Sequence, residues 1–282
     1  MQHRCSSKEG TLHKVGTLYT CPEPQKFLRW NTDHSIGAGL MNLGNSCYVN
    51  AVIQCFVYNP AFQNCLSAYN HTEECTNDDF CLFCEFQKII PDILRNTKKI
   101  ISLPKILDAC LLKNKSFKSG REEDAHDFLI FILDWLNENC LNSYKDIPFC
   151  EKTKKTTPIW TIFGGSLLTR LRCLHCDFER RTSHPFMDLS IEISNVNSVE
   201  QALAQFTNDE LLNRSNRWLY TRCNKKRDAT KKISIETTPM ILLLYLKRFK
   251  SNRRLLTRTK IKKMVLFKKS LDLNPYLSPN HR

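Results

Sequence analysis

Cys47 is the residue of this chain whose neighbours best suit nucleophilic chemistry. Apolar residues recur after it at helical spacing and stop before Pro60, which predicts a helix with Cys47 in its first turn. The apolar positions of that helix are Val49, Val52, Ile53, Phe56 and Val57. Unpaired backbone N–H groups and the positive end of the helix dipole favour an anion at such a position, and the thiolate is the attacking form of cysteine.

Asn42 precedes Cys47 by five residues and carries an amide that can donate hydrogen bonds to a developing oxyanion. Gly39 and Gly44 lie on either side of it and allow a close approach of the backbone. Together these residues indicate acyl transfer through a thioester on Cys47. The alternative is that Cys47, one of 14 cysteines, is a small buried apolar residue, which is a common role for a free thiol.

The whole segment 39–50, GLMNLGNSCYVN, resembles the cysteine box of the ubiquitin-specific proteases, which are papain-like ubiquitin carboxyl-terminal hydrolases. The family pattern is Gly-Leu-x-Asn-x-Gly-Asn-Thr-Cys-Tyr-Met-Asn, and this chain departs from it only at Ser46 and Val49. The resemblance implies a deubiquitinase that hydrolyses bonds to the C-terminal glycine of ubiquitin without a catalytic cofactor. It makes Cys47 the nucleophile and Asn42 the oxyanion residue.

A second segment, REEDAHDFL at residues 121–129, leads into an apolar stripe of helical period. Ser119 and Glu122 have the spacing of a capping box, which predicts that the helix starts near them. The segment is similar to the family's Gln-Glu-Asp-Ala-His-Glu-Phe-Leu, and this resemblance places Asp124 beside the arginine-bearing C-terminal tail of ubiquitin. It also makes His126 a helix residue and not the catalytic base. For Glu122 and Glu123 the alternative role is a favourable interaction with the positive end of the helix dipole.

Cys173 and Cys176 form a Cys-x2-Cys pair, the spacing of half a zinc site. They lie between the strand-like run 167–171 and the alternating strand 187–193. This order predicts a hairpin made by those two strands, with the cysteine pair at its tip.

The family completes this site with a Tyr-x-Cys-x-x-Cys segment, which this chain changes. Cys223 follows Tyr220 with altered spacing, and Lys226 stands at the fourth ligand position. A protonated lysine cannot coordinate zinc, so three thiolates are left, with His175 as a substitute ligand. Structural zinc sites strongly prefer four ligands, so the sequence is compatible both with zinc binding at this site and with its loss.

A second candidate zinc site follows the first helix. Its four residues have the spacing His-x3-Cys-x5-Cys-x2-Cys and are His71, Cys75, Cys81 and Cys84. Close relatives in the family carry similar cysteines at this place. A structural Cys3His site is one interpretation, and a set of buried thiols under a loop is the other, because sequence spacing does not show whether the four side chains converge.

The apolar run ILLLYLKRF at 241–249 follows Pro239 and predicts a strand buried on both faces. It resembles the Pro-x-x-Leu-x-x-x-Leu-Lys-Arg-Phe strand in the palm of the family. The resemblance covers residues 37–278 and is closest to the nuclear and nucleolar branch. It implies an α+β class and a papain-like domain over 37–282, with a helical thumb (37–155), β fingers (156–235) and a partial palm sheet (236–282), preceded by an extension over 1–36.

The catalytic imidazole is the part of the mechanism that the sequence does not supply. A cysteine protease needs such a base within reach of its thiol. The family places it in a Gly-His-Tyr segment well beyond the palm strand, and none of the histidines at positions 3, 13, 34, 71, 126, 175, 184 and 281 lies in a matching motif. We therefore expect a C-terminally truncated or degenerate chain of low activity. The alternative function is that of a non-catalytic ubiquitin-binding protein.

The net charge of +14 comes from 42 basic and 28 acidic residues, and eleven of the basic residues lie between Lys247 and Lys269. This stretch predicts either nucleic-acid binding and a nuclear or nucleolar address, or a solvated hairpin. There is no apolar run of roughly 18 residues and no signal-peptide pattern, which predicts an intracellular protein with reduced thiols and without a membrane partner. The expected partners are ubiquitin and ubiquitinated proteins, with nucleus or nucleolus favoured over cytoplasm.

Overall fold

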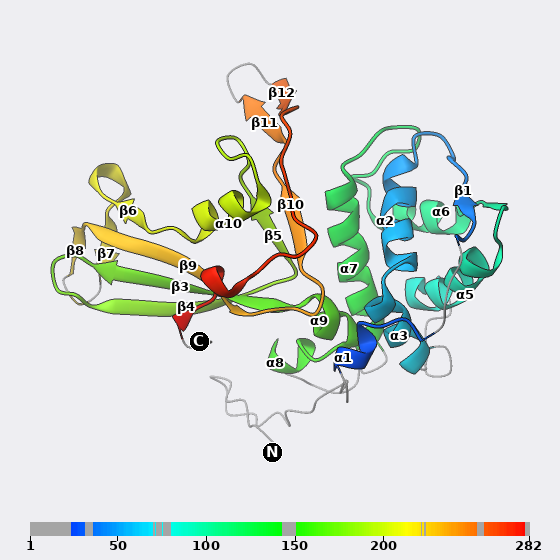
Figure 1. Cartoon of the computed structure of the whole chain (residues 1–282), viewed down its shortest axis with the longest axis horizontal. Coiled ribbons are helices and arrows are strands. Elements are labelled where there is room, and N and C mark those ends of the chain that lie inside the picture. The colour runs from blue at the N-terminus through cyan, green and yellow to red at the C-terminus, as the bar shows by residue number, and fades with distance from the viewer. Residues whose placement is uncertain are drawn as a thin grey trace. The chain divides into compact units, whose positions relative to one another are not determined.

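The computed structural model describes residues 24–31, 36–69, 71, 75, 80–142, 151–220, 222, 224–252 and 257–279 (Figure 1). The chain forms two compact units, Met1–Ile162 and Phe163–Arg282. Helices dominate the first unit and strands dominate the second, as expected for the α+β class. Within the described part of the chain, no helix has the length and apolar character needed to cross a membrane.

The helices of the first unit pack their apolar faces around aromatic side chains. The predicted face of α2 is confirmed, because its apolar positions are buried. Phe56 on α2 lies with its ring centroid 4.6 Å from that of Phe62 and 5.6 Å from that of Phe86. The helices are α1 (Pro24–Phe27), α2 (Cys47–Val57), α3 (Pro60–Ala68), α5 (Leu82–Arg95), α6 (Pro104–Lys113), α7 (Ala125–Asn142), α8 (Glu151–Lys154) and α9 (Pro158–Phe163).

The turn between α2 and α3 lies where the sequence predicts it. Asn59 is the N-cap of α3, and its side-chain oxygen accepts a hydrogen bond from Phe62 N at 3.1 Å. Pro60 takes the first helical position, where an N–H would have no partner within the helix. The two helices are therefore joined by a short turn that fixes the end of α2.

α7 begins later than the sequence predicts. Asp124 caps it, with Oδ1 accepting from His126 N at 2.8 Å. Gly120 has a φ of 70°, a left-handed conformation that interrupts any helical path through Ser119 and Glu122. The predicted capping box is therefore wrong. The predicted apolar stripe is buried at Phe128, Ile132, Leu133 and Leu136.

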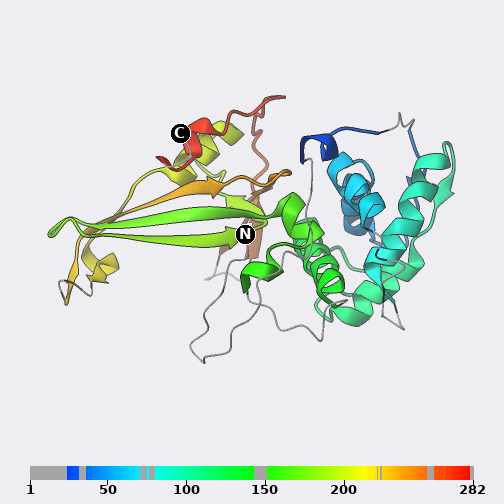
Figure 2. The same ribbon diagram turned by 90° about the horizontal axis from the view of Figure 1, so that it is seen from below.

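The second unit contains an antiparallel sheet of order β4-β3-β9-β6 (Figure 2). Its strands are β3 (Gly165–Cys173), β4 (Glu179–Phe186), β6 (Glu210–Leu212) and β9 (Ala229–Thr237). The hairpin partner of β3 is β4, so the predicted pairing of 167–171 with 187–193 is wrong. β4 has the sequence ERRTSHPF and is largely exposed on both faces, so it lacks the apolar alternation that marks a strand.

The predicted second hairpin strand pairs elsewhere. β5 (Asp188–Ile191) lies parallel to β10 (Leu243–Leu246), and α10 (Val199–Thr207) packs on the same core. All four side chains of β10 are half-buried, so the prediction of a strand buried on both faces is wrong. Among the described residues β5 is the only strand paired with β10, which leaves the second edge of β10 uncovered by any strand there.

The basic stretch 247–269 contains an antiparallel pair, β11 (Phe249–Asn252) and β12 (Thr257–Lys260). Arg248 Nη1 donates to the carbonyl oxygens of Ile261 and Lys263 at 3.2 and 3.0 Å. Lys263 Nζ in turn donates to Ser194 O at 3.2 Å. These contacts favour the hairpin interpretation for this part of the stretch. The short elements of the unit are β7 (Trp218–Tyr220), β8 (Lys225–Arg227), η1 (Arg214–Asn216) and η2 (Asn274–Tyr276).

Candidate functional site

Cys47 is the first residue of α2, as the sequence predicts, and its side chain is exposed. The N-cap residue Ser46 makes no side-chain cap, and the first turn carries no acidic residue. The backbone N–H groups of this turn and the helix dipole therefore act on the thiol without a competing carboxylate in the turn. No described residue forms a hydrogen bond with the Cys47 thiol. The alternative of a buried apolar cysteine is excluded by this exposure.

Ser46 orients the side chain of Asn42. Asn42 Oδ1 accepts from Ser46 N at 3.0 Å and from Ser46 Oγ at 3.2 Å, and Ser46 Oγ accepts from Leu43 N at 2.8 Å. Ser46 is only 3% exposed, so its polar groups depend on these partners. Because Oδ1 is engaged, the amide nitrogen is the end of Asn42 that can serve an external acceptor, and no described residue accepts from it.

Two asparagines fix the path of the loop before Cys47. Gly44 and Asn45 have φ values of 88° and 53°, and Asn45 Nδ2 donates to Gly120 O at 2.8 Å. Asn50 Nδ2 donates to Met41 O at 3.0 Å, where the chain leaves β1 (Gly39–Leu40). β1 itself pairs in parallel with β2 (Ile100–Ile101). The hydrogen bond from Asn45 to Gly120 thus ties the cysteine loop to the segment that leads into α7.

Tyr48 connects the two sequence motifs. Its ring packs edge-on against Phe128 of α7 at 5.3 Å and stacks with Phe117 at 6.1 Å. Burial raises the pKa of the Tyr48 hydroxyl, and the nearby carboxylate of Glu123 adds to the rise. Because Tyr48 follows Cys47 on α2 and Phe128 lies in the first turn of α7, their contact brings the start of α7 near the nucleophile.

Asp124 is half-buried at the N-terminus of α7, and its carboxylate takes part in the helix cap. The structure gives Asp124 a structural role, and the contact with the tail of ubiquitin that sequence similarity implies stays a prediction. His126 sits in the first turn of α7 with Nδ1 4.0 Å from Asp127 Oδ1, as expected for a helix residue.

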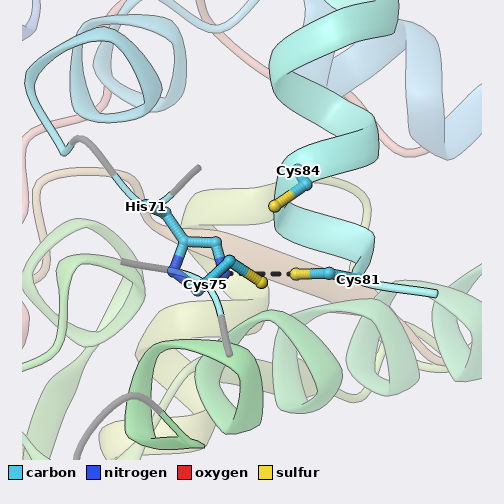
Figure 3. A group of neighbouring side chains, drawn as sticks. All are labelled: His71, Cys75, Cys81 and Cys84. Atoms are coloured by element: carbon cyan, nitrogen blue, oxygen red, sulfur yellow. Dashed lines mark hydrogen bonds between the residues drawn. The ribbon is translucent and has the colours of Figure 1, made fainter. Parts of the chain in front are cut away.

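The second candidate zinc group converges. The ligand atoms of His71, Cys75, Cys81 and Cys84 all lie within 4.8 Å of one another (Figure 3). His71 Nε2 is 3.2 Å from Cys81 Sγ, and both residues are buried. The edges of a tetrahedron around zinc with sulfur ligands measure about 3.8 Å, so small side-chain movements would complete the geometry.

Burial disfavours the thiolate form of the cysteines in this group. Burial raises the pKa of Cys81, and burial together with the charge of Cys81 raises the pKa of Cys84 to about 12. Thiols this crowded resist ionisation unless a cation balances the charge of their thiolates. A donor set of three sulfurs and one imidazole is typical of structural zinc. The side chains therefore converge as a zinc site requires, and the choice between a zinc site and a set of buried thiols passes to a metal analysis.

The fingers group is not completed by the described residues. Cys173 is buried at the end of β3 and Cys176 lies in the turn that follows, but His175 is exposed and does not form a convergent set of three with them. Cys223 lies outside the described residues. Lys226, at the fourth position, is exposed on β8.

Comparison with known sequences extends over most of the chain. A profile of the family described as "Ubiquitin carboxyl-terminal hydrolase" matches residues 38–282. Human ubiquitin carboxyl-terminal hydrolase 42 is 35% identical over 260 residues, which are 92% of this chain and 19% of that protein. Human ubiquitin carboxyl-terminal hydrolase 17-like protein 5 is 36% identical over 247 residues, 87% of this chain and 44% of that protein. The chain therefore spans less than half the length of these two relatives.

Comparison with solved structures gives the same family. The structure described as "Structure of the SAGA Ubp8/Sgf11/Sus1/Sgf73 DUB module bound to ubiquitin aldehyde" matches with a TM-score of 0.73 and 25% identity. The match covers 88% of this chain and 56% of the solved chain. It confirms the α+β fold that the sequence predicts.

Proposed function

Because this chain belongs to the ubiquitin carboxyl-terminal hydrolase family, we propose that it is a thiol-dependent deubiquitinase acting on bonds to the C-terminal glycine of ubiquitin. The observation that carries the proposal is the exposed thiol of Cys47 at the start of α2, five residues after an amide whose oxygen is already engaged. The solved relative bound to ubiquitin aldehyde supports ubiquitin as the partner.

In the proposed reaction Cys47 Sγ bonds to the glycine carbonyl carbon, and the carbonyl oxygen becomes an oxyanion. The C–N bond then breaks, the amine leaves with a proton, and a thioester remains. Water cleaves the thioester, which releases the carboxylate of ubiquitin and restores the thiol. An imidazole or similar base must carry the protons, and no described residue hydrogen-bonds to the thiol. Turnover is therefore the measurement that separates hydrolysis from ubiquitin binding alone.

Asn42 is proposed to stabilise the oxyanion through its side-chain N–H groups. Its oxygen is held by two hydrogen bonds from Ser46, so the amide is preorganised and needs no reorientation during the reaction. Ser46 is one of the two departures from the family's cysteine box, yet its hydroxyl and backbone supply these contacts. The substitution is therefore compatible with an active site.

Asp124 is proposed to bind the C-terminal tail of ubiquitin. A half-buried carboxylate at this place offers charge-assisted hydrogen bonds to a guanidinium. One of its oxygens already accepts from His126 N, which fixes the orientation of the group. The cap therefore serves to aim the carboxylate as well as to start α7.

A structural zinc ion is proposed at His71, Cys75, Cys81 and Cys84. It would join the chain that follows α3 to the start of α5, since Cys81 is the N-cap of α5 and Cys84 lies in its first turn. Neutralised thiolates and closed coordination would stabilise this part of the first unit, without a role in the chemistry at Cys47. For the fingers group of Cys173, Cys176 and Cys223, zinc stays a prediction.

Nucleic-acid binding by the 247–269 stretch and a nuclear or nucleolar location also stay predictions. Three lysines of the stretch are exposed and could contact phosphates: Lys262, Lys268 and Lys269. Lys268 Nζ also lies 3.7 Å from Glu200 Oε1, which competes for its charge. Such binding would weaken steeply as salt is raised. An affinity for RNA that does not change with salt would contradict it.

The proposed hydrolysis is tested with a ubiquitin probe whose C-terminal electrophile traps a thiol nucleophile. We expect labelling of the wild type and none of Cys47→Ala. Cys55→Ala is the matched control, because Cys55 is an exposed thiol on the same helix. Its labelling should equal that of the wild type. Release of a fluorophore from the C-terminus of ubiquitin then measures turnover.

The outcomes separate the two functional classes. Ubiquitin binding without labelling would show a non-catalytic ubiquitin-binding protein. Labelling that persists in Cys47→Ala would refute the assignment of the nucleophile. If the folded protein neither binds ubiquitin nor is labelled by the probe, the proposed function as a whole is refuted.

A further inference from the structure

One face of the β4-β3-β9 sheet carries a row of cations. Strand register places Arg170 of β3 directly opposite Arg181 of β4 and also opposite Lys232 of β9. Opposed residues in antiparallel strands point to the same face, so the three side chains are neighbours. Arg172, two residues further along β3, lies on this face as well. Figure 2 shows the three strands running side by side.

Carboxylates pair with the other three cations but not with Arg170. Arg181 Nε is 2.6 Å from Glu179 Oε1, and Arg172 Nη2 is 3.0 Å from Asp177 Oδ1. Lys232 Nζ is 3.8 Å from Asp209 Oδ2, a long contact. Among the described residues Arg170 has no ion pair.

Arg170 also has a buried donor without an acceptor. Its Nε lies out of contact with solvent and has no hydrogen-bond partner among the described residues. A buried donor in this state is unfavourable, and like charges directly opposite one another in a sheet repel. The centre of the row therefore has positive charge that the protein itself does not balance.

A cavity of about 360 Å³ opens at this position. Arg170, Arg172 and Lys232 line it together with the hydroxyl-bearing Thr230. Glu179 and Asp209 lie at its walls, where each is engaged with one of the flanking cations. The volume is at the lower end of the range for small-molecule sites.

We propose that this cavity is a binding site for a phosphate-bearing anion, with Arg170 as its central ligand. A guanidinium offers N–H groups in a fork that fits two phosphate oxygens, and the ammonium of Lys232 adds a point charge. A phosphoryl dianion would supply the negative charge that the row lacks. The long contact between Lys232 and Asp209 allows the ammonium to turn from the carboxylate to the ligand.

The arrangement distinguishes this site from a merely basic surface. The opposite face of the same sheet also carries basic residues, among them Arg180 and Lys231. Lys231 is paired there with Glu210 at 3.3 Å, and the neighbours in register with Arg180 and Lys231 include the apolar Leu171. That face therefore lacks a row of opposed cations, and its residues provide matched controls.

The test measures binding of sodium tripolyphosphate and of a phosphoserine peptide to the full chain by calorimetry at physiological ionic strength. The variants are Arg170→Gln and Lys232→Gln, and their controls are Arg180→Gln and Lys231→Gln, which change the charge equally on the other face. We expect Arg170→Gln to weaken binding by about tenfold or more, the loss typical of a charge-assisted hydrogen bond. Lys232→Gln should weaken it less, and both controls should bind as the wild type does.

The two probes identify the source of the phosphate. Tighter binding of tripolyphosphate indicates a soluble oligophosphate, and tighter binding of the peptide indicates a phosphorylated protein. Thermal unfolding of each variant verifies that it is folded. Absence of binding of both probes to the wild type would overturn the proposal. Equal losses in Arg170→Gln and Arg180→Gln would also overturn it, because they would show attraction by net charge alone.

Discussion

Replacing Asn42 separates its two bonding functions. Its oxygen accepts from Ser46 N and Oγ at 3.0 and 3.2 Å, and its nitrogen is proposed to face the oxyanion. Asn42→Asp keeps an acceptor for Ser46 but removes the donor. We therefore expect Asn42→Asp to retain stability and to lose about 100- to 1,000-fold in rate, the usual effect of removing one oxyanion donor.

Asn42→Ala should differ from Asn42→Asp in stability. It removes the acceptor as well, and Ser46 is only 3% exposed, so its N–H would be left without a partner. Such a group costs about 1–3 kcal/mol, and each kcal/mol lowers the unfolding temperature by about 2–4 °C in a domain of this size. The alanine variant should thus be both slow and less stable.

The assay combines the rate of labelling by the ubiquitin probe with the unfolding temperature of each variant. The reasoning is refuted if Asn42→Asp is labelled at the wild-type rate. It is refuted equally if the alanine variant unfolds at the wild-type temperature, because the contact with Ser46 would then carry no stability.

Four further outcomes are expected. Asn45→Ala removes the hydrogen bond to Gly120 and should slow labelling of Cys47 while lowering stability by about 1 kcal/mol; unchanged labelling would show that this contact does not position the nucleophile. Asp124→Asn keeps the cap oxygen but removes the charge, so the KM for a ubiquitin substrate should rise without a fall in unfolding temperature, whereas an unchanged KM would remove Asp124 from the binding site. Cys84→Ser should abolish zinc in elemental analysis of the purified protein and lower its unfolding temperature, and acidification should release zinc from the wild type as its ligands are protonated; zinc retained in full by the variant would contradict the Cys3His site. Burial raises the pKa of the Cys110 thiol to about 12, so the unfolded chain loses this proton at a lower pH than the folded chain does. The free energy of unfolding, measured with denaturant, should therefore fall above about pH 8.5 by up to about 1.4 kcal/mol per pH unit. The same pH dependence in Cys110→Ala would assign the fall to other groups.

The sequence determined the local features of the candidate active site. The helical period after Cys47 placed the thiol at a helix start, because the spacing of apolar residues and the proline at position 60 are local signals. The Cys-x2-Cys spacing and the basic stretch are local signals of the same kind, because each consists of residue types at short spacing. The amide of Asn42 five residues before Cys47 indicated an oxyanion donor, and only similarity to the family implied a role for Asp124.

Contacts between distant segments could not be read from the sequence. The hydrogen bond from Asn45 to Gly120 joins residues 75 positions apart. The local signal is Asn45 directly after Gly44, two residue types that tolerate the left-handed conformation that both adopt. The start of α7 was predicted too early because a capping-box spacing also occurs in a turn. β4 was missed because its two faces are polar, and the burial of β10 was overestimated because an apolar run does not reveal how many strands flank it.

Which residues could act is thus determined by the sequence alone, since residue type and short spacing follow from covalent neighbours. Only the tertiary structure decided which of them meet. The fold brings the ligand atoms of His71 and Cys75 to those of Cys81 and Cys84 at the start of α5. Arg170 faces Arg181 and Lys232 because strand register sets them opposite. Both arrangements depend on packing between segments separated along the chain, and packing of that kind leaves no pattern in either segment alone.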